Sequence, residues 1–358
     1  MSLEKLREEI TAIDEKLLTL LDRRMEIASK VAWEKESGAS VYVPEREKLL
    51  FEKLGEKLKE SPYRNEVEDI YKEIISTSKR IQKNILSPGK KCVFLDLDGT
   101  LLNDEKQVCE RNRVMIERAL KEGHKMIVAT GRPLESAIIG AKKIDLAGPG
   151  CYIASYNGGV LYDCATGQKI FHVSLEPEYT EYLFQKARTA GIHIQAYCNG
   201  KVWAEEDNEE LRIYCKKGQL EYEIHNDVPK ELKERSGKVL LISFEEQKLK
   251  AFQKEMEGWS FGKVQSVFST REYLEYSPLG ISKGHAVETL ASLLGFDIKD
   301  TIAIGDEQND VSMILKAGLG VCMANGLDSI KEIADYVTTA NNNEGGVAEV
   351  LERFVLMR

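Results

Sequence analysis

The stretch Cys92–Leu102, CVFLDLDGTLL, decides the fold of most of this chain. Its apolar residues lead directly to two aspartates, Asp96 and Asp98, followed by a glycine and Thr100. A short apolar run bounded by turn residues predicts a buried strand. Carboxylates at the end of such a strand predict a chemical site at the carboxyl edge of a sheet.

Later segments repeat this arrangement of an apolar run followed by polar residues. KMIVAT (125–130) and TIAIG (301–305) are predicted parallel strands separated by helical patterns, which indicates an open, doubly wound α/β sheet. The polar residues near the strand ends and helix starts are Thr130 and Arg132 in ATGR, Lys283 in ISKG, and Asp306, Asn309 and Asp310 in GDEQND. A single DxD or TGR is weakly specific, but four such segments in this order point to one site.

The chemistry of this site follows from its carboxylates. Three carboxylates that converge on one sheet edge would raise one another's pKa unless a cation were present. Oxygen ligands alone favour Mg²⁺, held by few protein groups together with a substrate phosphate. Phosphoryl transfer also needs a nucleophile, an acid for the leaving oxygen and positive charge on the phosphoryl oxygens. The four segments contain residues of each kind.

Residues 92–358 resemble the phosphatases of the haloacid dehalogenase superfamily, on the motifs just quoted. The resemblance implies that Asp96 forms an aspartyl-phosphate and that Asp98 protonates the leaving alcohol and then activates water. It implies that Thr130 and Lys283 bind the phosphoryl group. The Mg²⁺ ligands implied are the carboxylates of Asp96 and Asp306 and the backbone carbonyl of Asp98, with Asp310 and Asn309 in or behind that shell; Arg132 and Asn157 are expected near the phosphate.

The long interval between Thr130 and Lys283 predicts an inserted cap, with a helix near 177–190 and a hairpin that turns at Asn199-Gly200. A mixed α/β cap at this place resembles the Cof-like subgroup, whose members act on small phosphorylated metabolites, often sugar phosphates. Tyr197, Trp203 and Tyr214 are candidates to face the substrate, although packing within the hairpin is the simpler interpretation.

In residues 3 to about 86 the apolar side chains recur with a helical period. Apolar side chains recur every three or four positions and predict helices from residue 3 to about 36, from Pro44 to about Lys59, and after Ser61-Pro62, with a break at 37–40. The first helix would be about 50 Å long at about 1.5 Å per residue. Such a helix cannot be buried by a chain segment of this size, which favours an intertwined helical dimer.

Cations within this helical pattern predict a second site. Arg24 and Lys35 return to nearly the same helical angle, and buried cations require an anion. An alternative is that they set the register of a helical bundle or pair with glutamates. The complete set resembles the all-helical class of chorismate mutases, and comprises Arg7, Arg24, Lys35, Arg46, Glu47, Ser78 and Gln82.

That resemblance implies a role for each member of the set. Arg24, Lys35 and Arg46 would hold the carboxylates and ether oxygen of chorismate, and Arg7 would come from the partner subunit. Glu47 would bind the ring hydroxyl or the ether-oxygen region, while Ser78 and Gln82 would complete the pocket. The sequence departs from the family pattern at Val43, where the family usually has an aspartate.

Composition narrows the class of protein. The 358 residues are 42% hydrophobic and 30% charged, which favours a soluble globular protein of two or three domains. The net charge of −9 argues against broad nucleic-acid affinity, and the lack of a long apolar run leads us to expect a cytoplasmic protein without a membrane partner. The expected domains are a helical domain (1–86), a linker (87–91), an α/β core (92–177 and 269–358) and a cap (178–268).

We therefore expect a dimeric, bifunctional enzyme that rearranges chorismate to prephenate and hydrolyses a small phosphorylated metabolite with Mg²⁺. In one alternative the helical domain only dimerises or senses a ligand. In another, the α/β domain is a phosphotransferase or a mutase that retains the phosphate.

Overall fold

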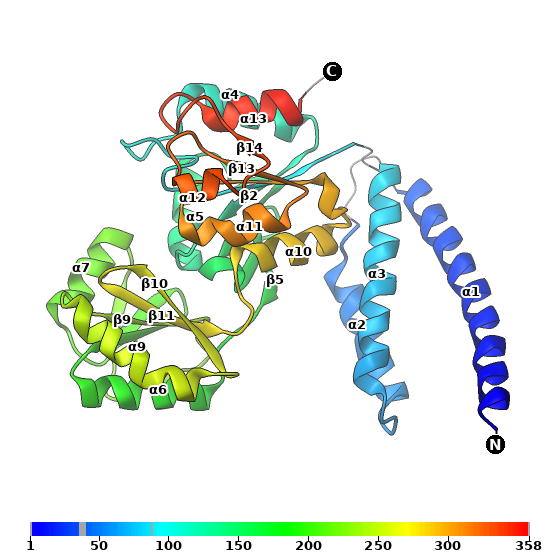
Figure 1. Ribbon diagram of the computed structural model, residues 1–358, viewed down its shortest axis with the longest axis horizontal. Helices are drawn as coiled ribbons and strands as arrows, with labels where there is room; N and C mark the ends of the chain where they lie inside the picture. Colours follow the sequence, from blue (N-terminus) through cyan, green and yellow to red (C-terminus); the bar gives the residue numbers. More distant parts are fainter. Residues whose placement is uncertain (1, 36–40, 87–88, 357–358) are drawn as a thin grey trace. The chain divides into compact units, whose positions relative to one another are not determined.

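The computed structural model describes residues 2–35, 41–86 and 89–356 (Figure 1). The chain divides into two compact units, Met1–Lys91 with Thr289–Asp300, and Cys92–Glu288 with Thr301–Arg358. The predicted break at 37–40 and the first two linker residues lie outside the described residues. None of the described helices has the length and apolar character needed to cross a membrane.

The first unit contains the three predicted helices, α1 (Leu3–Trp33), α2 (Pro44–Lys57) and α3 (Arg64–Leu86). The Ser2 hydroxyl accepts a hydrogen bond from the Lys5 amide and so caps α1, and Pro44 occupies the first turn of α2. The apolar stripe of α1 is mostly exposed in the single chain, with Ile10 58% and Leu20 67% accessible. Such a stripe needs a covering surface, and the expected dimer stays a prediction.

The segment Thr289–Asp300, which we expected in the α/β core, groups with the helices. The Asp300 carboxylate lies 2.9 Å from Lys91 Nζ and 3.5 Å from Lys83 Nζ. Ser292 Oγ donates to Ser76 Oγ at 2.9 Å. These polar contacts, invisible to sequence periodicity, join the segment to α3.

The second unit contains an eight-stranded sheet, the core sheet, in the order β14-β13-β12-β1-β2-β3-β4-β5. Its strands are β1 (Cys92–Leu95), β2 (Lys125–Ala129), β3 (Cys151–Ser155), β4 (Val160–Asp163), β5 (Gln168–His172), β12 (Thr301–Gly305), β13 (Leu319–Cys322) and β14 (Tyr336–Val337). The predicted parallel α/β sheet is confirmed, with β1 paired in parallel to β12 and β2. All four residues of β1 are inaccessible to solvent, and burial of each large apolar side chain contributes about 1.5–3 kcal/mol.

Two strands of the core sheet, β4 and β5, are antiparallel to their neighbours, which we did not predict. The links that precede them are too short for the crossover that parallel strands require, because only four residues separate β3 from β4. The helices of the unit's core are α4 (Glu110–Lys121), α5 (Leu134–Lys143), α11 (Val311–Lys316), α12 (Asp328–Lys331) and α13 (Gly346–Phe354). Helix α10 (Lys283–Leu294) begins in this unit and, from Thr289, belongs to the first unit.

The predicted insertion forms a second sheet, the cap sheet, in the order β10-β11-β9-β6-β7-β8. Its elements are α6 (Pro177–Ala190), β6 (His193–Cys198), β7 (Lys201–Ala204), α7 (Glu209–Gly218), β8 (Tyr222–Ile224), α8 (Val228–Glu231), β9 (Val239–Ile242), α9 (Glu246–Ser260), β10 (Val264–Thr270) and β11 (Tyr273–Pro278). Figure 1 shows α6 and α9 along this sheet, where their apolar side chains form one cluster with those of the strands.

The predicted hairpin is present as β6 and β7, and Asn199 and Gly200 both have positive φ, as a two-residue turn of this hand requires. The cap sheet extends beyond residue 268, where we expected the insertion to end, because β11 pairs with both β10 and β9.

Candidate active sites

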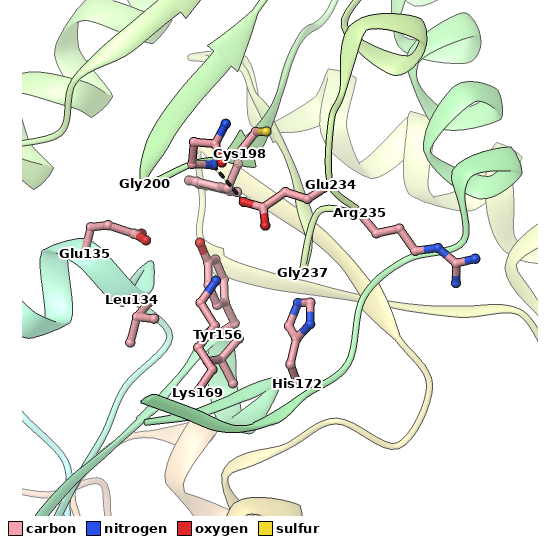
Figure 2. A pocket seen from close by; sticks show the side chains of 13 residues that line it. Leu134, Glu135, Tyr156, Lys169, His172, Cys198, Gly200, Glu234, Arg235 and Gly237 are labelled. Atoms are coloured by element: carbon pink, nitrogen blue, oxygen red, sulfur yellow. Dashed lines mark hydrogen bonds between the residues drawn. The ribbon is translucent and has the colours of Figure 1, made fainter. Parts of the chain in front are cut away.

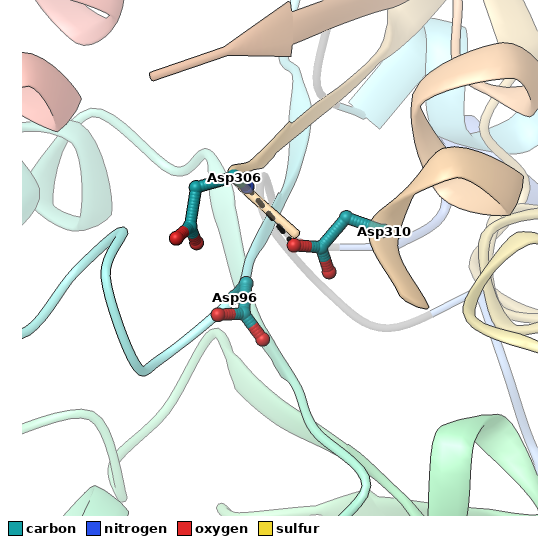
Figure 3. A group of neighbouring side chains, drawn as sticks. All are labelled: Asp96, Asp306 and Asp310. Atoms are coloured by element: carbon teal, nitrogen blue, oxygen red, sulfur yellow. Dashed lines mark hydrogen bonds between the residues drawn. The ribbon is translucent and has the colours of Figure 1, made fainter. Parts of the chain in front are cut away.

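Three aspartates meet at the carboxyl edge of the core sheet. Asp96 follows β1, Asp306 follows the adjacent parallel strand β12, and Asp310 ends a short 3₁₀ turn, Gln308–Asp310. One oxygen of each carboxylate lies within 4.8 Å of the others (Figure 3). Parallel pairing of β1 with β12 therefore brings together residues more than 200 positions apart.

The three carboxylates are buried, and burial disfavours their charged forms. Burial, opposed by the charge of Lys283 and reinforced by that of Asp310, raises the pKa of Asp96 to about 7. Burial also raises the pKa of Asp306 to about 6, although a hydrogen bond from Thr100 opposes the change. A cation at this position would remove the repulsion among the carboxylates.

Lys283 supplies one positive charge from the first residue of α10. Its Nζ lies 2.5 Å from Asp96 Oδ1 and 2.6 Å from Asp310 Oδ1. Burial alone would lower the pKa of Lys283, but the two carboxylates raise it above its usual value. The other oxygen of Asp310 accepts the amides of Asp306 and Glu307 at 3.0 and 3.1 Å, so this carboxylate is fixed on both sides.

The turn after Asp98 packs against the Asp306 carboxylate, and it has no room for a side chain at Gly99. Gly99 has φ +87°, and a Cβ at this position would lie 2.2 Å from Asp306 Oδ2. Thr100 Oγ1 donates to Asp306 Oδ1 at 2.7 Å, and Asn325 Nδ2 donates to the Gly99 carbonyl at 2.7 Å. The glycine of the motif is thus required both by its backbone conformation and by the available space.

Asp98 is held by two cations at the rim of the site. Lys106 Nζ lies 2.9 Å from Asp98 Oδ1, and an Arg132 nitrogen lies 2.6 Å from Asp98 Oδ2. Burial would raise the pKa of Asp98, but the hydrogen bonds and charges of Lys106 and Arg132 lower it below its usual value. Sequence reasoning missed Lys106 and Asn325, since neither belongs to a recognisable motif.

The predicted phosphate-binding residues lie on neighbouring loops. Thr130 follows β2 and is buried, and its Oγ1 accepts the Arg132 amide at 3.2 Å. Asn157 has φ +55°, and its amide donates to the Thr130 carbonyl at 3.0 Å. The Asn157 Oδ1 atom is buried and has no hydrogen-bond partner among the described residues. Asn309 is exposed on the turn that ends at Asp310.

A small polar pocket lies between the core and cap sheets (Figure 2). Glu135, Tyr156, Lys169 and His172 line it from the core, and the residues from the cap side are Tyr197, Cys198, Asn199, Gly200, Glu234, Arg235 and Gly237. Within this lining, the Asn199 amide donates a hydrogen bond to the Glu234 carboxylate at 2.8 Å.

All three aromatic residues that we considered as substrate contacts have partners within the protein. Tyr197 and Tyr214 share a hydroxyl–hydroxyl hydrogen bond of 2.6 Å. Trp203 stacks on His225 with ring centroids 3.7 Å apart. Tyr197 alone of these three lines the polar pocket.

The helical unit brings several of its predicted ligands together. Arg24 donates to the Ile74 carbonyl at 3.3 Å and to the Ser78 hydroxyl. The pKa of Lys35 is lowered by burial and by the charge of Arg46. The pKa of Arg24 is also lowered, by burial and by Arg46. The three cations therefore lie near one another, which favours an anionic ligand.

Glu47 and Arg7 have different environments. The Glu47 carboxylate lies 2.8 Å from Nζ of the buried Lys79, a residue that we did not single out. Arg7 is exposed on α1, and 17 residues of helix place it about 25 Å along the axis from Arg24, beyond the reach of one site in the same chain. Gln82 lies one turn after Ser78 on α3 and is partly buried.

Comparisons with known proteins agree with both halves of this arrangement. The sequence model described as haloacid dehalogenase-like hydrolase matches residues 93–351, and the one described as chorismate mutase type II matches residues 6–83. The 5-amino-6-(5-phospho-D-ribitylamino)uracil phosphatase YcsE of Bacillus subtilis is 30% identical over 273 residues, which cover 74% of this chain and 96% of that protein.

Solved structures give the same result for the second unit. A haloacid dehalogenase-like hydrolase from Bacteroides thetaiotaomicron superposes with a TM-score of 0.69 at 31% identity, covering 74% of this chain and 99% of that one. A Thermotoga maritima structure matches with a TM-score of 0.67 at 30% identity, covering 74% and 97%.

Proposed function

We propose, from the premise that this chain belongs to the haloacid dehalogenase-like hydrolase family and also carries a chorismate mutase domain, that it hydrolyses a small phosphomonoester through an aspartyl-phosphate and converts chorismate to prephenate. The observation that carries the phosphatase proposal is the convergence of Asp96, Asp306 and Asp310 around Lys283. No other described group of acidic, histidine or cysteine side chains converges in this way.

The proposed hydrolysis has two steps. An Asp96 oxygen attacks phosphorus, and the bond from phosphorus to the alcohol oxygen breaks. Asp98, which Lys106 and Arg132 hold mainly ionised in the free protein, must take up a proton in the substrate complex to give it to that oxygen. Asp98 then takes a proton from water, whose oxygen attacks the phosphorus and releases phosphate and Asp96. Lys283 and the Thr130 loop bind the phosphoryl oxygens throughout.

The carboxylate cluster fits Mg²⁺. Three buried carboxylates with one ammonium carry an excess of negative charge, and the donors are all oxygen. Burial, together with the neighbouring carboxylates, raises the pKa of Asp96 and of Asp306. Asp96, Asp306 and Asp310, with the Asp98 carbonyl, would hold the ion. When bound, Mg²⁺ would supply positive charge to the carboxylates and the phosphoryl oxygens.

The phosphatase proposal is tested with Asp96→Asn. Purified enzyme with Mg²⁺ is expected to release phosphate from an aryl phosphate, while Asp96→Asn loses this activity and retains the mutase activity. In the wild type, acid quenching should trap one labile phosphoryl group per site, and the variant should trap none. An Asp96→Asn enzyme that still hydrolysed the aryl phosphate would exclude the aspartyl-phosphate route.

A small phosphorylated polyol or sugar is the substrate class we favour. YcsE and two further Bacillus subtilis relatives carry names that specify a phosphorylated ribityl compound. The pocket of Figure 2 offers carboxylates, a lysine and a histidine, which suit hydroxyl groups better than an apolar leaving group. A screen of sugar and polyol phosphates should give higher kcat/KM than apolar aryl phosphates, and the reverse order would refute this class.

For the helical unit, the cations of Arg24, Lys35 and Arg46 support the mutase proposal. A pericyclic rearrangement of a dianion needs its reactive conformer restrained and fixed charges where negative charge develops, without a nucleophile or cofactor. Ser78 orients Arg24, and Glu47 is oriented by Lys79. Arg24→Ala should abolish prephenate formation and leave aryl-phosphate hydrolysis unchanged.

The homodimer is part of this proposal and is testable through Arg7. If Arg7 enters the partner's site, mixing Arg7→Ala and Arg24→Ala subunits restores one intact site in each mixed dimer. Random exchange then recovers about a quarter of the wild-type mutase activity, because half of the dimers are mixed and each has one good site. Two inactive variants that stay inactive after subunit exchange would contradict a shared site.

Val43 supports a hypothesis that competes with the mutase proposal, namely that the helical unit senses a ligand without converting it. Val43 precedes α2 and makes no side-chain cap to the helix, at the position where the resemblance leads one to expect aspartate. Wild-type protein that bound prephenate but did not convert chorismate would favour sensing over catalysis.

A further inference from the structure

Lys238 of the cap side connects the two sheets of the second unit. It immediately precedes β9, and its side chain is 3% accessible. Its Nζ lies 2.8 Å from Glu275 Oε1 and donates to the Gly131 carbonyl at 3.1 Å. Glu275 belongs to β11 of the cap sheet, whereas Gly131 belongs to the core. One ammonium therefore joins the cap to the loop after β2.

The loop that receives this bond lies in the proposed phosphate site. Gly131 stands between Thr130, expected to bind the phosphoryl group, and Arg132, which contacts Asp98. Asn157 donates its amide to the Thr130 carbonyl at 3.0 Å, and Tyr156 donates its amide to the Arg132 carbonyl at 3.1 Å. The core thus fixes the carbonyls on either side, and the cap supplies the donor for the carbonyl between them.

The surroundings of Lys238 exclude water from this bond. The Nζ atom lies 5.8 Å from the ring centres of both Tyr156, in the core, and Tyr197, in the cap. The two rings meet edge to face with centroids 5.6 Å apart, and both residues are buried. Low exposure strengthens a charged hydrogen bond and makes its loss costly.

Charge balance alone does not require the contact with Gly131. Glu275 already neutralises Lys238 within the cap sheet, because β9 and β11 are neighbouring strands. The bond to the core carbonyl uses a second of the three ammonium hydrogens. The salt bridge to Glu275 could form without the bond to Gly131. The bond to Gly131 therefore acts on the position of the Thr130–Arg132 loop.

We propose that Lys238 is a positioning residue of the phosphatase, which holds the Thr130–Arg132 loop in its phosphate-binding conformation when the cap rests on the core. This inference depends on the proposed phosphatase function. If Lys238 has this role, rapid phosphoryl transfer requires its hydrogen bond to Gly131. The cap then affects the rate of the reaction as well as the choice of substrate.

Two variants separate this role from a structural one. Lys238→Met leaves Glu275 buried without its partner and should destabilise the second unit. Lys238→Met with Glu275→Gln removes both charges and should recover the unfolding midpoint, but not the bond to Gly131. We expect kcat for aryl-phosphate hydrolysis to stay about 10- to 100-fold low in the double variant, with a small change in KM.

Three further variants sharpen the comparison. Glu275→Gln alone keeps the bond to Gly131 and should stay within a few-fold of wild-type kcat. Lys238→Arg keeps a cationic donor and should exceed Lys238→Met in kcat. Lys186→Met breaks a cap ion pair with Glu255, 3.2 Å long and remote from the core loop, and should leave kcat unchanged.

The outcomes distinguish failure of this inference from failure of the proposed function. A folded double variant with wild-type kcat, or equal kcat for the Arg and Met variants, overturns the role of Lys238. Mutase activity of each variant serves as an internal measure of intact protein. Hydrolysis that survives Asp96→Asn would instead overturn the proposed phosphatase mechanism.

Discussion

Substitution of Gly99 by alanine is expected to inactivate the phosphatase through a single methyl group. The new Cβ would lie 2.2 Å from Asp306 Oδ2, so the carboxylate must move. Movement breaks the hydrogen bond from Thr100, and a bond to a charged group contributes about 1.5–3 kcal/mol. The left-handed backbone conformation, φ +87°, costs alanine about 1–2 kcal/mol more.

Gly262 offers a matched control for the backbone cost. It has φ +72° and no atom within 4 Å of a built Cβ. Gly262→Ala should therefore lose only the shared cost of about 1–2 kcal/mol in unfolding free energy. Gly99→Ala should lose about 1.5–3 kcal/mol beyond that, which is the contribution of the broken bond to Asp306.

The two variants are compared by urea unfolding and by hydrolysis of an aryl phosphate at several Mg²⁺ concentrations. We expect kcat/KM of Gly99→Ala to fall about 100-fold, because a displacement of about 1 Å in a reacting group can cost this much. Half-maximal activity should need more Mg²⁺, and mutase activity should not change. Equal phosphatase activity in Gly99→Ala and Gly262→Ala would refute the close fit of Gly99 to Asp306.

Three further predictions concern charged residues outside this contact. Lys79→Met should lower the unfolding free energy of the helical unit by about 1–3 kcal/mol, since it leaves Glu47 largely buried without a partner, and added Glu47→Gln should recover most of the loss in a urea titration. Hydrogen bonds from Tyr336 and from the 339–340 amides outweigh burial and lower the pKa of Glu349 to about 2. Glu349→Gln should therefore be less stable than the wild type at pH 7. Its deficit in thermal midpoint should shrink as the pH falls from about 4.5 towards 2. Lys106 lowers the pKa of Asp98, so Lys106→Met should raise that pKa and move the alkaline limb of the pH–kcat profile to higher pH.

The acidic site was predictable because its residues follow strand ends. Once β1 and β12 are recognised as buried parallel strands, Asp96 and Asp306 must reach the same sheet edge. The hairpin at Asn199-Gly200 was equally accessible, since its turn chemistry is local. These features depend only on local pattern and on the geometry of parallel strands.

Other contacts depend on packing that no local pattern encodes. Lys106 and Lys238 are single lysines in polar segments, and each reaches the site from a separate loop or sheet. Lys79 lies in a helix whose stripe predicts only that one face is buried. The antiparallel strands β4 and β5 escaped prediction because their hairpin adds an edge without changing the apolar pattern of the parallel strands.

The sign of the charge at each candidate site explains why the class of ligand was easier to infer from the sequence than the individual contacts. Around Lys283, burial and the neighbouring carboxylates raise the pKa of Asp96 and of Asp306, which is a cost that a cation would relieve. Near Arg24 the sign is reversed, because burial and neighbouring cations lower the pKa of basic groups. Clusters of groups with perturbed pKa values are concentrated at functional sites, and the residue types in the sequence already give the sign of the charge. This difference in sign is why we propose a divalent cation with a phosphate for the acidic site and an anion for the basic site.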